Sequence, residues 1–323
     1  MTNPRFYAEW LALKALLASL ERGDMRQAWA KIRRVSTVVK WFGRSHWLWA
    51  RRNLQLVFGP QLNPPDRERL IAIALEQHLG SYLEGLRGRD VAVRVMDGDR
   101  VRAAHAAGRG VIIASVHLGS WEPGLRWFDQ VGISAAVVYR RAFNPFSERE
   151  FQTVRATHGV EWIEEDNVMQ MVRALRSGKA LVLMTDLNTG VGGIPSEFLG
   201  FTAMCPPGPA KLALRYGCPI LPCFGIREQD AVVTYHCGLP LELPTATSPA
   251  GAIAGLTRQI NAAFEPWILE HAEQYNWFHP RWRFRPEGRV WRVTDPLEQQ
   301  LAERVSAFPL LSERVRRFLS ERS

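Results

Sequence analysis

Strand-length and helix-length segments alternate along the chain from about residue 91, and this alternation constrains the fold more than any other feature. Short apolar runs with a bias towards β-branched residues predict strands at 91–95, 111–116, 134–139, 160–163, 180–184, 219–224 and 231–236. The stretches between them predict helices at 99–107, 120–130, 146–157, 166–177, 207–216 and 249–273. Such alternation is typical of an α/β fold with a mixed, mainly parallel sheet flanked by helices.

The N-terminal part of the chain follows a helical pattern instead. Its apolar residues recur at three- and four-residue steps, and one helix is expected at 66–86, with His78 as a core residue on its inner side. We therefore expect a helical N-terminal region, 1–90, that belongs to the same domain as an α/β region, 91–296. A charged helical pattern predicts a peripheral C-terminal tail at 297–323.

Most of the formal net charge of +9 is concentrated in residues 1–60, which hold eleven Lys and Arg against three acids. Large aromatic residues accompany these charges: Trp10, Trp29, Trp41, Phe42, Trp47 and Trp49. Basic helices with tryptophans are typical of proteins that dock on an anionic membrane surface. A solvated basic face is the alternative interpretation. None of the familiar nucleic-acid signatures is present, so no nucleic acid is expected as a partner.

Several classes of protein are excluded by what the sequence lacks. No uncharged apolar stretch reaches about 18 residues, so no membrane-spanning helix is expected. Glu9 and Lys14 interrupt the N-terminal apolar segment, which argues against a cleavable signal. The four cysteines lack the spacing of a zinc site and are interpreted as buried thiols in a reducing compartment: Cys205, Cys218, Cys223 and Cys237. We expect neither a metal nor a cofactor.

Residues 111–126, VIIASVHLGSWEPGLR, combine a strand end with the start of a helix. His117 follows the apolar run directly, Ser120 is expected to cap the next helix, and Glu122 falls in its first turn. In open α/β sheets, ligands bind in the crevice beyond the carboxyl ends of the strands. His117 and Glu122 are therefore candidate site residues.

The two side chains can meet if His117 leans over the start of that helix. The partial positive charge of a helix N-terminus would keep Glu122 ionised, and an ionised carboxylate bonded to one imidazole nitrogen makes the other nitrogen more basic. That arrangement is a general base, His117, with Glu122 as the group that orients it. The alternative is a strand-end histidine that bonds a loop carbonyl, with Glu122 as an ordinary helix-start acid.

Two other predicted strands end in polar residues at the same edge of the sheet. Arg140 and Arg141 end the stretch VVYRR, and Asp186 follows the run ALVLMT. An arginine at this edge can bind a phosphate or carboxylate through two parallel hydrogen bonds. The alternatives are a surface arginine and a loop carboxylate that accepts backbone N–H bonds.

Taken together and in order, these stretches resemble the late acyltransferases of lipid A biosynthesis, within the broader lysophospholipid and glycerolipid acyltransferases. The resemblance rests on the H-x4-E spacing of His117 and Glu122, the Tyr-Arg before Asn144, the block at 194–224, and the stretch EQYNWFHPRWRFRPEG at 273–288. Within that last stretch the chain departs from the family pattern at Pro280, Trp282 and Arg283, and these departures concern acceptor specificity.

The resemblance implies transfer of an acyl chain from acyl carrier protein or acyl-CoA to a hydroxyl of a membrane glycolipid such as a lipid A precursor. His117 would remove the hydroxyl proton, with Glu122 orienting it. It marks Arg140 as the functional arginine, with Arg141 as its substitute if the register differs by one, and Asp186 as a residue that helps arrange the site. It also implies a peripheral enzyme on the cytoplasmic side of the inner membrane, docked through residues 1–60.

Two other functions remain open at this point. A serine hydrolase or thioesterase would use Ser120, although no G-x-S-x-G surrounds that serine. The other alternative is a non-catalytic basic protein at the membrane surface. Because no hydroxyl or thiol stands in an activated position, we expect direct transfer without a covalent acyl-enzyme, and Cys205 is the residue most able to contradict this. Trp277, His279 and Arg281 are expected to brace the floor of the site or to face anionic headgroups.

Overall fold

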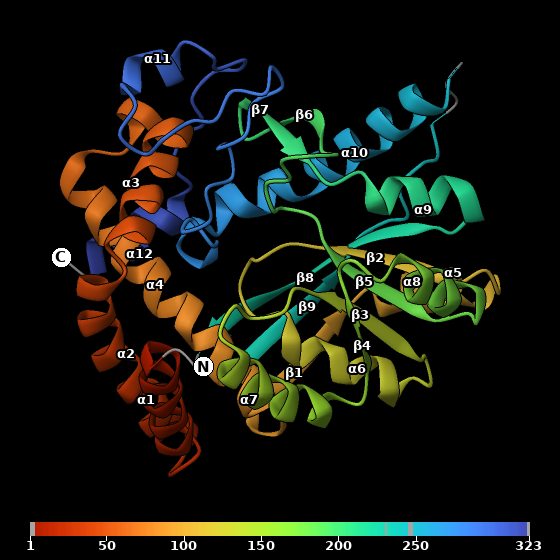
Figure 1. Cartoon of the computed structure of the whole chain (residues 1–323), viewed down its shortest axis with the longest axis horizontal. Coiled ribbons are helices and arrows are strands. Elements are labelled where there is room, and N and C mark those ends of the chain that lie inside the picture. Colours follow the sequence, from red (N-terminus) through yellow and green to blue (C-terminus); the bar gives the residue numbers. More distant parts are fainter. Residues whose placement is uncertain (1–3, 230, 245–247, 322–323) are drawn as a thin grey trace.

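The centre of the molecule is a seven-stranded sheet in the order β1-β9-β8-β2-β5-β3-β4 (Figure 1). The computed structural model describes residues 4–229, 231–244 and 248–321, without the side chains of residues 40–42 and 229. The strands of the sheet are β1 (Ala92–Met96), β2 (Val111–Ser115), β3 (Ala135–Tyr139), β4 (Glu161–Glu164), β5 (Ala180–Met184), β8 (Ile220–Gln229) and β9 (Val232–Cys237). Each lies within a few residues of a predicted strand, except that β8 runs five residues further.

All neighbouring strands of this sheet are parallel except β8 and β9, which form an antiparallel hairpin. Alternate residues of β2 face opposite cores: Ile112 and Ala114 join one buried cluster, whereas Val111 and Ile113 join the other. A strand that is apolar on both faces needs cover on both sides. The prediction of a mixed, mainly parallel sheet flanked by helices is confirmed.

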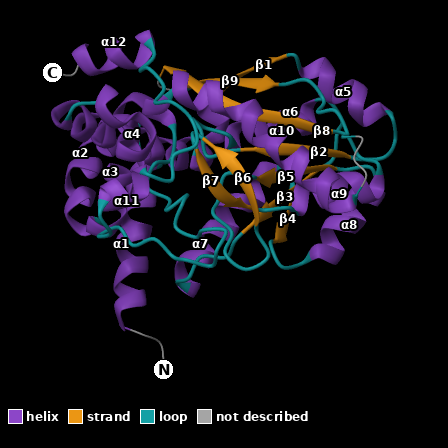
Figure 2. Ribbon diagram, turned by 90° about the horizontal axis from the view of Figure 1, so that it is seen from above, coloured by secondary structure: helices purple, strands orange, loops and turns teal. Residues whose placement is uncertain are grey.

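Helices cover both faces of the sheet (Figure 2). Buried residues of α8 (Val168–Arg176), α9 (Gly208–Tyr216) and α10 (Pro249–Glu270) join the same core as Ile112. The opposite core receives residues of α5 (Gly98–Ala106) and α6 (Leu125–Gln130). The remaining helix of this region, α7 (Pro145–Arg155), buries none of its own residues.

The N-terminal helices lie beside the sheet, at the left of Figure 1. They are α1 (Pro4–Leu20), α2 (Met25–Phe42), α3 (Arg44–Phe58) and α4 (Pro64–Leu86). Residues of α3 and α4 belong to the same buried cluster as the strand residue Ile112. A smaller cluster fixes α2 against α4 through Trp29 and Leu83. None of the helices in the described part of the chain combines the length and apolar character that a bilayer crossing requires.

The tryptophans of this region do not form one exposed set. Trp29 is fully buried, so its interpretation as an interfacial residue is wrong. The indoles of Trp10 and Trp47 are half-buried and donate hydrogen bonds to Glu150 and Glu68. The side chains of Trp41 and Phe42 lie outside the described residues.

A second sheet, absent from the predicted strands, is the hairpin of β6 (Ile194–Phe198) and β7 (Phe201–Cys205). Its turn places Leu199 and Gly200 at positive φ, 49° and 85°. Hairpin turns of this kind are signalled by Asn-Gly or Asp-Gly, which Leu-Gly does not resemble. Glu265 on α10 stabilises the turn by accepting a 3.1 Å hydrogen bond from Leu199 N.

The C-terminal tail is not one continuous helix. It contains α11 (Leu297–Leu301) and α12 (Glu313–Glu321), separated by irregular chain that includes Pro309, which has no N–H to continue a helix. Nor is the tail wholly peripheral, because Val315 and Leu319 of α12 are buried in the main core. The division into regions at residues 90 and 296 stays a prediction.

Candidate active site

The two strands at the middle of the sheet deliver His117 and Asp186 to the same point. β2 and β5 are parallel neighbours, and their register pairs Ser115 with Met184. His117 lies two residues after Ser115, and Asp186 lies two residues after Met184. The carboxyl ends of parallel strands meet at one edge, so the two side chains emerge side by side.

His117 and Asp186 are joined by two hydrogen bonds. The backbone N–H of His117 donates to Asp186 Oδ2 at 3.0 Å, and the imidazole Nδ1 lies 2.8 Å from Oδ1. Asp186 is buried, whereas the imidazole is partly exposed. A carboxylate at Nδ1 fixes the tautomer in which Nε2 is free to accept a proton.

The interaction between the two side chains also shifts the pKa values of both. Burial lowers the pKa of His117, but the charge and hydrogen bond of Asp186 outweigh burial, so the pKa is raised. Burial raises the pKa of Asp186, but the charge and hydrogen bonds of His117 prevail and lower it to about 2. The carboxylate therefore stays ionised at neutral pH while the imidazole becomes a stronger base.

Glu122 does not take the role predicted for it, because the carboxylate that accepts the hydrogen bond from the imidazole Nδ1 is that of Asp186. It begins a single 3₁₀ turn, Glu122–Gly124, before the short helix α6. Burial raises the pKa of Glu122 to about 7, and the charges of Arg155 and His117 offset this only in part. The expected helix N-terminus is thus a 3₁₀ turn here, and it does not hold the pKa of this carboxylate below its usual value.

The loop that carries His117 is held from two sides. Ser120 N donates to Gly225 O at 2.9 Å, and Gly119 N donates to Gln274 O at 3.0 Å. Gly119 has a positive φ of 61°, and a Cβ there would lie 1.9 Å from Gly225 O. Only glycine allows this close approach of loop and strand.

A cavity of about 290 Å³ opens at this edge of the sheet, and its wall includes His117 and Glu122. The same wall includes residues of α4, β3 and β4: His78, Ser81, Tyr82, Val138, Tyr139 and Trp162. A second, mainly apolar cavity of about 270 Å³ shares His78 and Tyr82 with the first. The two spaces are therefore neighbours, the first with a mixed polar and apolar wall and the second with a mainly apolar one.

Of the two candidate arginines, only Arg140 lines the first cavity among the residues that the structure describes. Its side chain is 67% exposed, and Nε donates to Glu165 at 2.6 Å. Arg141 is similarly exposed and pairs with Glu164 at 2.9 Å. Arg140 thus lies at the mouth of the cavity.

Arg155 is the cavity residue that sequence reasoning missed. Its side chain is only 19% exposed, and the guanidinium lies over the rings of Tyr139 and Trp162, 4.3 and 5.1 Å from their centroids. Its carboxylate partner is Glu148, at 3.5 Å. The sequence offered only an arginine near the end of a predicted helix, where basic residues are favoured for general reasons.

His78 also differs from its interpretation as a core residue, because it lies on the wall of both cavities. Its ring contacts the rings of Tyr82 and Phe278. Burial lowers the pKa of His78 to about 4, so the imidazole is neutral at physiological pH.

The candidate nucleophiles are all buried. Ser120 is fully buried, and its hydroxyl has no hydrogen-bond partner among the described residues, so it is neither a helix cap nor bonded to a base. The hydroxyl of Ser115 is likewise buried and has no hydrogen-bond partner among the described residues. Cys205 is buried behind the site, where Arg281 donates to its sulfur at 3.0 Å. All four cysteines are free and buried, as predicted.

The stretch 273–288 braces the site from behind. Trp277 and Arg281 are almost fully buried, which excludes contact of these two side chains with lipid headgroups. His279 Nε2 accepts a hydrogen bond of 2.9 Å from Asn188 N, in the loop after Asp186. The bracing interpretation is therefore correct for this stretch.

An imidazole bonded to a carboxylate, and to no serine or cysteine among the described residues, is suited to remove a proton from a substrate hydroxyl. Residues 2–284 match the family of bacterial lipid A biosynthesis acyltransferases. The chain belongs to this family, and it is an acyltransferase.

Curated relatives agree with this assignment. A phosphatidylinositol mannoside acyltransferase of Mycobacterium tuberculosis (strain CDC 1551) is 27% identical over 72% of this chain and 76% of the relative. The lipid A biosynthesis palmitoleoyltransferase of Escherichia coli K12 is 30% identical over 74% and 79% of the two chains. The lauroyltransferase of the same strain is 25% identical over 73% and 79%.

Among solved structures, a 1-acyl-sn-glycerophosphate acyltransferase from Thermotoga maritima is similar over 69% of this chain and 95% of that chain. The two share 10% of their residues, and the TM-score is 0.34. The family assignment therefore rests on the sequence matches.

Proposed function

We propose that this acyltransferase moves a fatty acyl chain from an acyl thioester, on acyl carrier protein or coenzyme A, to a hydroxyl of a membrane glycolipid. The observation that carries the proposal is the His117–Asp186 pair on the wall of the cavity. The names of two relatives refer to lipid A biosynthesis and to phosphatidylinositol mannoside, and both lipids are glycolipids.

The proposed chemistry is general-base catalysis by His117. Because Nδ1 is bonded to Asp186, Nε2 accepts the proton of the acceptor hydroxyl while the hydroxyl oxygen attacks the thioester carbonyl. Collapse of the tetrahedral intermediate breaks the C–S bond, and the proton passes from Nε2 to the departing sulfur. Asp186 stabilises the imidazolium between these steps. A general base contributes about 10²–10⁴-fold, so orientation of the two substrates supplies the rest.

The two cavity arginines are suited to hold polar parts of the substrates. Arg140, at the mouth, would bind an anionic group of donor or acceptor. Arg155 and Glu122 lie further in, close enough for their charges to interact, and would hold polar groups next to the reacting hydroxyl. In this proposal Glu122 binds substrate and does not orient the base.

The apolar cavity beside the site is suited to the acyl chain of the donor. It is lined by side chains of α2, α3 and α4 together with Phe278, and it meets the catalytic cavity at His78 and Tyr82. A thioester carbonyl held at that junction would lie next to His117, with its hydrocarbon tail removed from water.

We also propose that the enzyme docks peripherally on the cytoplasmic face of the inner membrane through its N-terminal residues. Figure 2 shows α1 extending away from the body of the molecule. The exposed side of α1 carries Tyr7 and Leu11 together with alanines, and Phe143 beside it is 90% exposed. Apolar side chains presented next to a basic region fit the surface of an anionic bilayer.

The test uses purified protein with acyl carrier protein and coenzyme A thioesters as donors. Lipid A precursors and phosphatidylinositol mannosides serve as acceptors, and products are identified by mass spectrometry. We expect one acylated glycolipid to form with the wild type and to disappear with His117→Ala. Hydrolysis of the thioester without any acylated lipid, across all these acceptors, would contradict the proposal in favour of a thioesterase.

A further inference from the structure

The C-terminal helix α12 lies beyond residue 284, where the match to the family ends, yet it contacts the segment that holds the catalytic loop. Its start is fixed by Ser312, which accepts a hydrogen bond from Val315 N and donates one to Glu270 O, both of 3.1 Å. Val315 and Leu319 are buried in the main core. The helix is therefore anchored at both ends.

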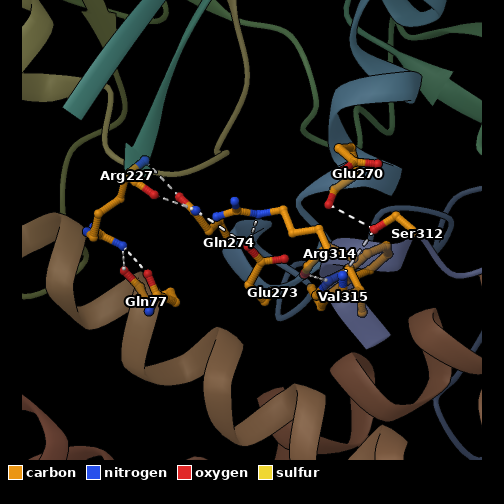
Figure 3. A network of polar contacts seen from close by, with 10 residues as sticks. Gln77, Arg227, Glu270, Glu273, Gln274, Ser312, Arg314 and Val315 are labelled. Carbon is orange, nitrogen blue, oxygen red and sulfur yellow. Dashed lines mark hydrogen bonds and ion pairs between the residues drawn. The ribbon is translucent and has the colours of Figure 1, made fainter. Parts of the chain in front are cut away.

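Arg314 projects from this helix to Glu273, as Figure 3 shows. Its Nε donates to Glu273 Oε1 at 3.1 Å. The Glu273 side chain is fully buried, and Oε2 has no hydrogen-bond partner among the described residues. Burial raises the pKa of Glu273, and the charge of Arg314 lowers it in part. Arg314 is the cation that compensates this buried carboxylate.

The next residue, Gln274, is bonded to strand β8. Its Oε1 accepts from Arg227 N at 2.9 Å, and its Nε2 donates to Arg227 O at 2.8 Å (Figure 3). The guanidinium of Arg227 is in turn bonded at two points to the buried Glu84 of α4, each of 2.7 Å. Gln274 thus links this segment to the sheet and, through Arg227, to α4.

Residues 274–276 pair with the loop that carries the catalytic histidine. Gly119 N donates to Gln274 O, and Asn276 N donates to His117 O, both at 3.0 Å. Leu118 and Tyr275 form an antiparallel bridge between these two contacts. The segment that follows Glu273 is therefore hydrogen-bonded to His117 itself and to Gly119, two residues further along the loop.

We propose that Arg314 is a positioning residue that acts through Glu273 on the loop of His117. This inference rests on the proposed role of His117 as the base. Without the guanidinium, the buried carboxylate has no compensating cation and must move towards water or take up a proton, and residues 274–276 move with it. A misplacement of about 1 Å in a catalytic group costs up to about 10²-fold in rate.

The experiment compares Arg314→Ala with Arg317→Ala, an exposed arginine on the same helix. We expect Arg314→Ala to lose about tenfold or more in kcat with KM within about twofold, and Arg317→Ala to retain both. Arg314→Lys keeps the charge and should recover most of the loss. Hydrogen exchange supplies a second readout, because the amide of Gly119 should exchange faster in Arg314→Ala only.

A further pair of variants covers the case in which Arg314→Ala folds poorly. Glu273→Gln removes the charge that needs compensation, so the double variant Arg314→Ala/Glu273→Gln should fold and regain part of the lost kcat. Unchanged kcat and Gly119 exchange in folded Arg314→Ala, an equal loss in Arg317→Ala, or a rise in KM alone would overturn the proposal. The proposed function fails separately, if His117→Ala remains active.

Discussion

His117 and Asp186 are held together both through the side chain and through the backbone, because one carboxylate accepts from the histidine N–H and bonds the imidazole Nδ1. The ring cannot rotate without breaking the second bond, and the loop cannot move without straining the first. The register of β2 and β5 sets this geometry. The orientation of the base is therefore a property of the sheet.

Replacing the imidazole should remove catalysis without unfolding the protein. His117→Ala is expected to lower kcat by about 10²–10⁴-fold, because it deletes the group that accepts the hydroxyl proton. The buried Asp186 loses its side-chain partner but keeps the bond from the backbone N–H of residue 117, so the melting temperature should fall while the protein stays folded. His105→Ala on α5 is the matched control and should keep full activity. Near-normal acyl transfer by folded His117→Ala would refute the mechanism.

Removing the charge of Asp186 should change the pH dependence in a defined direction. The base must be neutral, so the wild-type rate falls as the pH falls through the raised pKa of His117. In Asp186→Asn the charge is gone but burial remains, and burial lowers that pKa. The acid limb of kcat/KM should move to lower pH, with a plateau about 10²–10⁴-fold below the wild type.

The matched control for this profile is Asp166→Asn, an exposed acid that follows β4. Profiles between pH 5 and 9 compare the three proteins. An acid limb that stays in place in Asp186→Asn, or moves to higher pH, would show that Asp186 does not set the basicity of His117.

The sequence predicted the strands well because their signal is local. Buried strands such as β2 and β5 need continuous β-branched and apolar runs, and these are visible without any knowledge of neighbours. The edge where ligands bind follows from the parallel order, so His117, Arg140 and Asp186 were all predicted at that edge. In the structure His117 and Arg140 lie on the cavity wall, and Asp186 is hydrogen-bonded to His117.

The pairing of those residues was not predictable, because it depends on contacts between segments far apart in sequence. Asp186 replaces Glu122 as partner of the base because β5 lies next to β2, and no local pattern specifies that neighbour. The contact of the Arg155 guanidinium, on α7, with two aromatic rings requires Tyr139 of β3 and Trp162 of β4. Burial of Ser120 depends on Gly225 of β8 in the same way.

Gly85 of α4 should control the position of Glu122. A Cβ at this glycine would lie 1.9 Å from Glu122 Oε2, so Gly85→Ala must displace the carboxylate. Alanine is otherwise favoured over glycine inside a helix by about 1 kcal/mol. We expect activity to fall about tenfold or more while the melting temperature is retained. Gly208→Ala has open space around its Cβ and is the control. Equal activities of the two variants would mean that the Glu122 position is unimportant.

The raised pKa of Glu122 has a consequence for stability. Between pH about 4.5 and 7 the unfolded chain releases this proton while the folded protein keeps it, so this group's contribution to stability falls as the pH rises. The total over that window is about 3 kcal/mol at most. Glu122→Gln has no carboxyl group to titrate at this position, so it does not lose this contribution. The free energy of unfolding of the variant minus that of the wild type should therefore increase from pH about 4.5 to 7. Urea unfolding across this range measures the difference, and a constant difference would contradict the assignment.

Docking through α1 should depend on its exposed apolar side chains. Leu11 is 46% exposed on α1, and Phe143 lies 5.4 Å from the ring of Phe6 on the same helix. Burial of one such side chain in a bilayer contributes about 1.5–3 kcal/mol, so Leu11→Ser/Phe143→Ser should bind anionic vesicles at least about tenfold more weakly. Leu310→Ser alters an exposed leucine of the C-terminal tail and should bind like the wild type.

Salt separates the two contributions to this docking. The basic residues of the N-terminal region act through charge, so binding of the wild type should weaken at 1 M salt, where the Debye length is about 3 Å. The apolar contribution persists in salt, so the ratio between wild type and Leu11→Ser/Phe143→Ser should remain. Vesicle flotation at low and high salt measures both effects. Equal binding of the wild type and the double variant under both conditions would exclude α1 as the docking helix.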